Sequence, residues 1–146
     1  MSKDMQVKKI LVPIDGSEAS LRTAKYALML ANQLNAPIVL LHVISIPQFP
    51  RYFKSVDQYY KVARIEAESW FDVIKNLPES KNLKITTKII TGAISVVESI
   101  IEYARNEDVR LIIIGTRGRS RFTRLLLGSV ASGVVTHADC PVLLVK

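Results

Sequence analysis

The sequence is poor in the residues that build disulfide frameworks and metal sites. Its single cysteine, Cys140, cannot form an internal disulfide bond. It lies in the apolar stretch DCPVLLV, without a nearby cluster of cations to lower its pKa. We therefore expect Cys140 to be a small buried side chain. The two histidines, His42 and His137, and one distant cysteine make a poor set of metal ligands.

Long apolar runs are lacking as well. No stretch approaches the roughly 18 apolar residues that indicate a membrane span. The charged start, MSKDMQVKK, is not followed by an apolar core of signal-peptide length. These two absences predict a soluble, cytoplasmic protein without a membrane partner.

Size and charge set the remaining limits. The chain has 146 residues, of which 49% are hydrophobic, so a single domain over residues 1–146 is expected. The formal net charge of +7 favours anionic partners. Charge alone leaves nucleotide, nucleic acid and acidic protein open.

Apolar segments alternate along the chain with segments of helical period. Strands are predicted at residues 8–15, 38–44, 84–91, 109–115 and 141–146, the third being less apolar, nearer a sheet edge and ended by Gly92. Helices are predicted at 17–35, 56–77, 94–105 and 129–137, with Ile94 and Trp70 packed inward. This alternation predicts an α/β fold, in which helices cover both faces of a parallel sheet.

Two segments that follow strands carry the candidate chemistry. Residues 13–17, PIDGS, follow the first strand, and residues 115–120, GTRGRS, follow the fourth. Ligands of such sheets bind beyond the carboxyl ends of the strands, so both segments could face one crevice. Glycines at 115 and 118 would let backbone N–H groups approach oxygen atoms, and Gly128-Ser129 at a helix start would add further donors. Neither a P-loop nor a dinucleotide-binding glycine motif is present.

The spacing G-x2-G-x9-G-S, formed by Gly115, Gly118, Gly128 and Ser129, resembles the ATP-binding motif of universal stress proteins. The similarity extends over essentially the whole chain, through ILVPIDGSEAS, LLHVI and GSVASGVVTHADCPVLLVK. It implies an open, doubly wound, five-stranded parallel sheet of order 3-2-1-4-5, of the adenine nucleotide alpha hydrolase-like type. In that order, residues 141–146 form an exposed apolar edge, so the resemblance also implies a homodimer through this strand.

The resemblance implies a set of cofactor-binding residues for ATP, AMP or ADP. Those expected around adenine and ribose are Pro13, Asp15 and Val43. Those expected around ribose and phosphates are Gly115, Thr116, Arg117, Gly118, Arg119, Ser120, Arg121, Gly128, Ser129, Val130 and Ala131.

Several of these residues have more than one reading. Asp15 could accept hydrogen bonds from ribose, help to hold Mg²⁺, or only form a turn before Gly16. We favour a function for it. Ser129 is expected both to cap the last helix and to bond a phosphate.

The chemistry expected from these residues is binding, with at most slow ATP hydrolysis. No Ser-His-Asp order or close carboxylate pair is evident, and neither histidine is assigned a catalytic role. A nucleic-acid binder using the basic run from Arg117 to Arg124 is a weaker alternative, because only Phe122 interleaves with the arginines. A dimeric scaffold that binds no nucleotide is a third.

Overall fold

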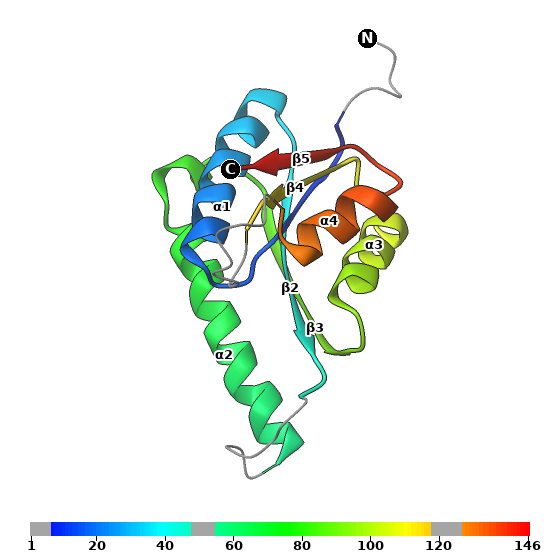
Figure 1. Ribbon diagram of the computed structural model, residues 1–146. Helices are drawn as coiled ribbons and strands as arrows, with labels where there is room; N and C mark the ends of the chain where they lie inside the picture. Colours follow the sequence, from blue (N-terminus) through cyan, green and yellow to red (C-terminus); the bar gives the residue numbers. More distant parts are fainter. Residues whose placement is uncertain (1–6, 48–54, 118–126) are drawn as a thin grey trace.

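The protein folds as a parallel sheet that lies between two layers of helices (Figure 1). The computed structural model describes residues 7–47, 55–117 and 127–146. The elements, in chain order, are β1 (Ile10–Pro13), α1 (Glu18–Leu34), β2 (Ile38–Ser45), α2 (Val56–Lys75), a short 3₁₀ helix (Pro78–Ser80), β3 (Ile85–Ala93), α3 (Val96–Asn106), β4 (Leu111–Gly115), α4 (Ser129–His137) and β5 (Val142–Val145).

The sheet has the predicted order, β3-β2-β1-β4-β5, and all four strand pairs are parallel. The strand order reverses at β1, which pairs with β2 on one side and β4 on the other. Ile10 and Leu11 of β1 lie opposite Leu111 and Ile112 of β4. The expected fold class is therefore confirmed, as is the edge position of β3.

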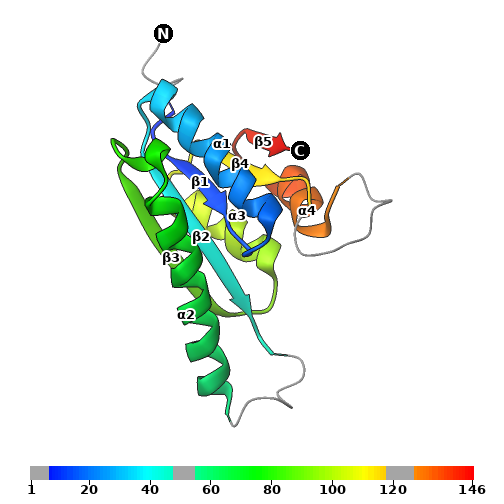
Figure 2. The same cartoon turned by 90° about the vertical axis from the view of Figure 1, so that its left-hand side faces the viewer.

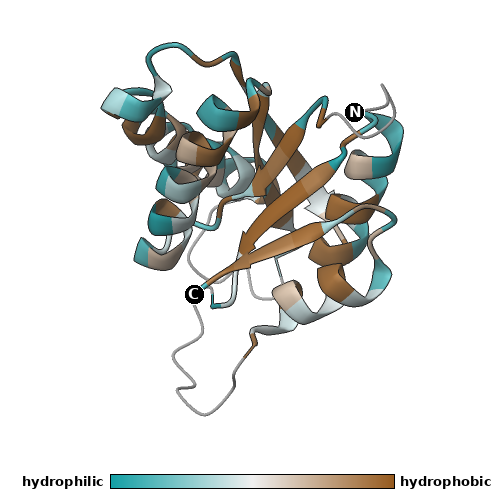
Figure 3. Ribbon diagram, turned by 90° about the horizontal axis from the view of Figure 1, so that it is seen from above, coloured by the Kyte–Doolittle hydropathy of each residue, from teal (hydrophilic) through white to brown (hydrophobic). Residues whose placement is uncertain are grey.

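The sheet has an apolar core on each face, and successive residues of a strand point alternately into one core and the other. Ile10 and Val12 of β1 face α1 and α2, where the buried core includes Leu28, Phe71 and Ile74. Leu11, between them, faces the opposite core, to which α3 and α4 contribute. In Figure 2, α1 and α2 lie in front of the strands and α3 lies behind them. Figure 3 shows hydrophobic colour on the strands and hydrophilic colour on much of the helix surfaces.

The ends of α1 show why its sequence forms a helix over this range. The Ser17 hydroxyl accepts a hydrogen bond from the Ser20 N–H at 3.1 Å, which caps the first turn. Asn35 ends the helix in a left-handed conformation, with φ of 52°. Trp70 packs against the core beside α1, as predicted.

Two predicted boundaries around β3 are wrong. Gly92 does not end the strand: with φ of +73° it lies inside β3, which continues to Ala93 after a register shift opposite Ile44 and Ser45. Ile94 does not belong to α3 and is 92% exposed. The Ser95 hydroxyl accepts from the Glu98 N–H at 3.1 Å, so the helix starts after Ile94.

Candidate functional site

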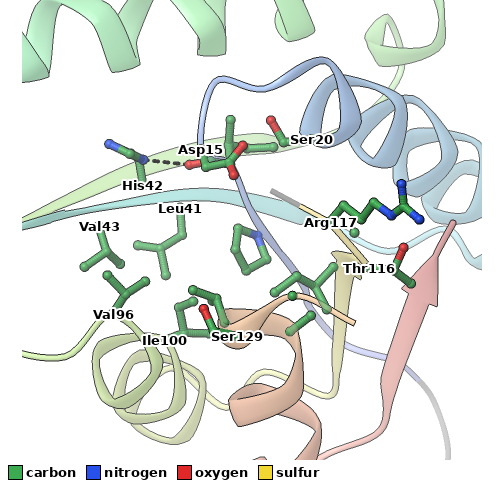
Figure 4. A pocket seen from close by; sticks show the side chains of 17 residues that line it. Asp15, Ser20, Leu41, His42, Val43, Val96, Ile100, Thr116, Arg117 and Ser129 are labelled. Carbon is green, nitrogen blue, oxygen red and sulfur yellow. Dashed lines mark hydrogen bonds between the residues drawn. The ribbon is translucent and has the colours of Figure 1, made fainter. Parts of the chain in front are cut away.

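The carboxyl ends of β1, β2 and β4 surround a pocket with a volume of about 300 Å³. Because β1 and β4 are neighbours at the point where the strand order reverses, their following loops open toward the same space. The first turns of α3 and α4 close the other side. The pocket is lined by Pro13, Ile14, Asp15, Ser20, Leu41, His42, Val43, Val96, Ile100, Ile114, Gly115, Thr116, Arg117, Gly128, Ser129, Val130 and Ala131 (Figure 4).

The structure brings together the predicted site residues that it describes. Ten of them line this one pocket: Pro13, Asp15, Val43, Gly115, Thr116, Arg117, Gly128, Ser129, Val130 and Ala131. The other four, Gly118, Arg119, Ser120 and Arg121, lie outside the described residues. Residues more than 110 positions apart in the sequence, such as Pro13 and Gly128, thus share one wall.

The two walls of the pocket differ in chemistry. Figure 4 shows Leu41, Val43, Val96 and Ile100 gathered on one side and Thr116 with Arg117 on the other. The apolar side suits a flat, hydrophobic group. Arg117 and Thr116 offer a cation and a hydroxyl, and the start of α4, where Figure 4 places Ser129 beside Ile100, adds N–H donors; these groups suit an anion.

A backbone hydrogen bond joins the polar parts of this wall. The Gly128 N–H donates to the Thr116 carbonyl at 2.6 Å, and the Thr116 N–H donates to the Val145 carbonyl at 2.9 Å. The residue after β4 is therefore held both to β5 and to the start of α4. The first-turn N–H groups of α4 lie beside it at the pocket, without acceptors inside their own helix.

Ser129 does not cap α4, contrary to the sequence prediction. The N-cap is Gly128, with φ of −65° and ψ of 159°, and it makes no side-chain capping bond. Ser129 is instead the first helical residue, and it lines the pocket. Its hydroxyl therefore has no part in capping the helix.

Asp15 forms a turn and also lines the pocket. Its Oδ1 accepts hydrogen bonds from the Ser17 N–H at 2.9 Å and from the Ser17 hydroxyl at 2.5 Å. These bonds hold the carboxylate close to Ser17, the N-cap of α1. Asp15 thus forms the turn before Gly16, and its carboxylate also lies at the pocket, where a ligand could reach it.

Two glycines near the site are required by packing. Gly16 has φ of +82°, and a Cβ built on it would lie 2.3 Å from Cζ2 of Trp70. A Cβ on Gly115 would lie 2.8 Å from the Thr23 hydroxyl oxygen of α1. Gly115 therefore allows β4 and α1 to approach each other, a reason that the motif spacing did not reveal.

Sequence reasoning missed seven residues of the lining: Ile14, Ser20, Leu41, His42, Val96, Ile100 and Ile114. Leu41 and His42 directly precede Val43 in β2, so their closeness to the site could have been inferred from the strand. Val96 and Ile100 had no such signal, because apolar residues four apart in a helix are typical of a core.

His42 is half-buried and packed against its neighbours. Its Nδ1 lies 2.6 Å from the Ile14 carbonyl oxygen, and its ring meets that of Trp70 edge-on, with centroids 5.0 Å apart. Among the described residues, no three His, Cys, Asp or Glu side chains lie together as a ready metal site.

Cys140 does not line this pocket. It lies in a separate hollow, beside Arg105, Arg110 and Asp139. Burial raises the pKa of the Cys140 thiol above its ordinary value, and the Asp139 carboxylate raises it further. Arg105 is itself paired with Asp139 at 2.8 Å. Cys140 is only partly buried, whereas the sequence predicted a buried side chain, and its environment disfavours the thiolate.

Comparisons with known proteins bear on family and fold. A model of the universal stress protein family matches residues 6–146. The universal stress protein MJ0531 of Methanocaldococcus jannaschii is 33% identical over 141 residues, which cover 95% of this chain and 82% of that protein.

Among the described residues, no helix is long and apolar enough to cross a membrane.

Solved structures share the fold over nearly the whole chain. The structure of MJ0577, from the same archaeon, superposes with a TM-score of 0.82 and 29% identity, covering 97% of each chain. A universal stress protein from Archaeoglobus fulgidus, solved in complex with dAMP, has a TM-score of 0.68 and 22% identity, covering 97% of this chain and 100% of that chain.

Proposed function

Because this chain belongs to the universal stress protein family, we propose that it binds an adenine nucleotide in the pocket at the ends of β1 and β4. One observation carries the proposal: the Gly128 N–H bond to the Thr116 carbonyl, at 2.6 Å, sets the start of α4 beside the end of β4. Unbonded N–H groups at a helix start attract phosphate oxygens. The apolar residues of the same pocket can take a base.

The proposed orientation follows from the two walls. The adenine ring packs between Leu41, Val43 and Val96, and the ribose lies near Asp15 and Pro13. The phosphates face Arg117 and the N–H groups of Ser129 and Val130. Gly118, Arg119, Ser120 and Arg121 are proposed to complete the phosphate contacts.

Mg²⁺ fits this site only together with the nucleotide. Asp15 is the single carboxylate among the described residues of the lining, and Mg²⁺ takes about six oxygen ligands. The remaining ligands would come from phosphates and water, so Asp15 would hold the ion as one of several donors. Positioning of the phosphates without an evident general base supports at most slow hydrolysis.

ATP is the proposed physiological ligand, with AMP or ADP as alternatives. The dAMP-bound relative from Archaeoglobus fulgidus supports an adenine nucleotide as the class. We further propose that the protein is a cytoplasmic homodimer joined through β5, and that its nucleotide state alters a surface read by partners in a stress response.

Calorimetry tests the binding proposal directly. Wild-type protein is titrated with ATP and with AMP, each with and without Mg²⁺, and saturable binding of at least one nucleotide is expected. No binding at millimolar nucleotide would refute it. Mass spectrometry of ligands released by denaturing freshly purified protein identifies any nucleotide that the protein carries from the cell.

Binding of a nucleic acid is the alternative to exclude. The described member of the basic run, Arg117, lines the pocket, which favours a small ligand. If nucleic acid were the ligand, its affinity would fall steeply with salt and would depend on several arginines between residues 117 and 124. The same protein sample, titrated with a short duplex at two salt concentrations, separates the two functions.

A further inference from the structure

The turn that carries Asp15 is held by two side chains, His42, which also lines the pocket, and Trp70, which does not. Ile14 is the residue just past β1, and its N–H still donates to the Leu41 carbonyl of β2 at 2.8 Å. Pro13 opposite Leu41 is the last residue pair of β1 with β2. The next contact between these segments is made by a side chain: His42 Nδ1 lies 2.6 Å from the Ile14 carbonyl oxygen.

The direction of this hydrogen bond is fixed by its chemistry. A carbonyl oxygen only accepts, so Nδ1 of His42 carries the proton and donates it to Ile14. Figure 4 shows the imidazole reaching from β2 to this oxygen. The bond fixes the peptide between Ile14 and Asp15, and therefore the direction in which Asp15 leaves the sheet.

Trp70 supports the same turn from α2. Its indole meets the His42 ring at an interplanar angle of 90°, with centroids 5.0 Å apart. The indole also lies where a side chain of Gly16 would be, within 2.3 Å to 2.7 Å of a Cβ built there. The segment Ile14–Gly16 is thus enclosed between β2 and α2, and no residue of α2 lines the pocket itself.

Given the proposed nucleotide site, on which this step rests, we propose that His42 is a positioning residue for nucleotide binding. It acts through the Ile14 carbonyl: the donated hydrogen bond holds the Asp15 turn in the shape that the ligand requires, with Trp70 fixing the imidazole. The proposed role in nucleotide binding belongs to the hydrogen-bond donor at the Nδ1 position, and not to packing of the imidazole ring.

Replacement of His42 by Asn and by Leu separates the donor from the ring. The side-chain nitrogen of asparagine occupies nearly the place of histidine Nδ1, so His42→Asn keeps the donor and loses the ring. His42→Leu removes the donor at similar volume. Nucleotide affinity, measured by calorimetry, should fall roughly five- to tenfold in His42→Leu, the usual effect of losing one neutral hydrogen bond, and should be restored in His42→Asn.

His137 provides the matched control. Its Nδ1 also contacts a backbone carbonyl, that of Gly133 at 3.0 Å, but it is exposed at the end of α4 and does not line the pocket. His137→Leu should therefore bind nucleotide like the wild type. Equal weakening in His137→Leu and His42→Leu would overturn the proposal, as would wild-type affinity in His42→Leu or equally weak binding in His42→Asn.

A second measurement needs no nucleotide. The Ser17 N–H donates to Asp15 Oδ1, so its hydrogen exchange in the free protein reports the order of the turn. Exchange at Ser17 should be roughly five- to tenfold faster in His42→Leu than in the wild type and His42→Asn. If wild-type protein binds no nucleotide, the proposed function fails, whereas unchanged exchange in His42→Leu refutes the positioning role alone.

If His42→Leu does not fold, His42→Gln, whose nitrogen lies one carbon further out, takes its place with the same expectation.

Discussion

The Gly128 N–H donates to the Thr116 carbonyl at 2.6 Å, and this bond joins the end of β4 to the start of α4. The two halves of the glycine motif are thus brought together by backbone, without a side chain between them. The Thr116 N–H also donates to the Val145 carbonyl of β5, so these two hydrogen bonds connect the start of α4 to the edge strand of the sheet. The proposed binding of phosphate by first-turn N–H groups depends on this geometry.

Gly128→Ala should weaken nucleotide binding without unfolding the protein. With φ of −65° and ψ of 159°, Gly128 has a conformation that alanine also adopts, so the backbone does not require glycine. The added methyl group would stand at the pocket wall, and roughly tenfold weaker binding by calorimetry is expected. Thr136→Ala, on α4 but away from the pocket, is the control. Equal affinity of Gly128→Ala and wild type would place the phosphates elsewhere.

Gly118→Ala is expected to weaken binding in the same way. The expectation rests on the sequence motif alone, because Gly118 lies outside the described residues.

Ser129→Ala tests the hydroxyl beside the helix start. Because Gly128 is the N-cap, loss of the Ser129 hydroxyl removes no capping bond, and the free energy of unfolding should change by less than about 0.5 kcal/mol. Binding should weaken roughly tenfold, since a hydrogen bond to a charged phosphate is lost. Urea unfolding and calorimetry on one sample measure both effects. A loss of about 1 kcal/mol of stability with unchanged affinity would instead assign the hydroxyl to capping.

Much of the fold could be predicted because its causes are local or periodic. The continuous apolar strands and the helical spacing between them required a parallel sheet, and Ser17 before Glu18 marked the start of α1 correctly. Errors arose where one contact outweighed a pattern. Ile94 fits the apolar period of α3, but Ser95 caps the helix, which therefore starts two residues later, at Val96, and leaves Ile94 exposed.

The site was predictable to the extent that backbone chemistry determines it. The ends of the predicted strands indicated the loops after β1 and β4, glycine spacing supported the second, and residues 13–15 and 115–117 do line one pocket. Long-range packing was not readable from spacing. Neither the contact of Gly16 with Trp70 nor that of Gly115 with Thr23 leaves a local signal, because each joins segments that are far apart in the sequence.

Gly115→Ala should destabilise the fold through its contact with Thr23. The new Cβ would lie 2.8 Å from the Thr23 hydroxyl oxygen in a buried region, and overpacking of this kind costs about 1–3 kcal/mol. Thr23→Ala removes that oxygen, so the double variant should be more stable than the two single effects predict, by about 1 kcal/mol or more in urea unfolding. Simple additivity would show that Gly115 is needed for another reason, such as close approach of a ligand.

Cys140 should react slowly with a thiol reagent in the folded protein. Burial raises the pKa of its thiol, so at neutral pH a smaller fraction is thiolate than in an ordinary cysteine, and the thiolate is the nucleophile. The rate should still be rising with pH above about 8.5, where an unperturbed cysteine passes its midpoint. The unfolded protein in urea is the internal control and should react with an ordinary pH profile. Matching profiles in both states would contradict the shift.

The outer edge of β5 is the proposed dimer contact, and its hydrogen-bond directions suggest a selective variant. The carbonyls of Pro141 and Val145 accept from Ile112 of β4 and from Thr116 just after it. The backbone of Leu144, one residue out of phase with them, therefore points its N–H away from β4.

Leu144→Pro should abolish the dimer while leaving the pairing of β4 with β5 intact, because the one backbone N–H that proline removes points outward. Leu144→Ala keeps the donor and loses the packing of the side chain against the core, so it controls for stability. In sedimentation velocity, wild type and Leu144→Ala should run as dimers and Leu144→Pro as a folded monomer. A dimeric Leu144→Pro variant would assign the interface to another surface, and a monomeric wild type would remove the dimer from the proposed function.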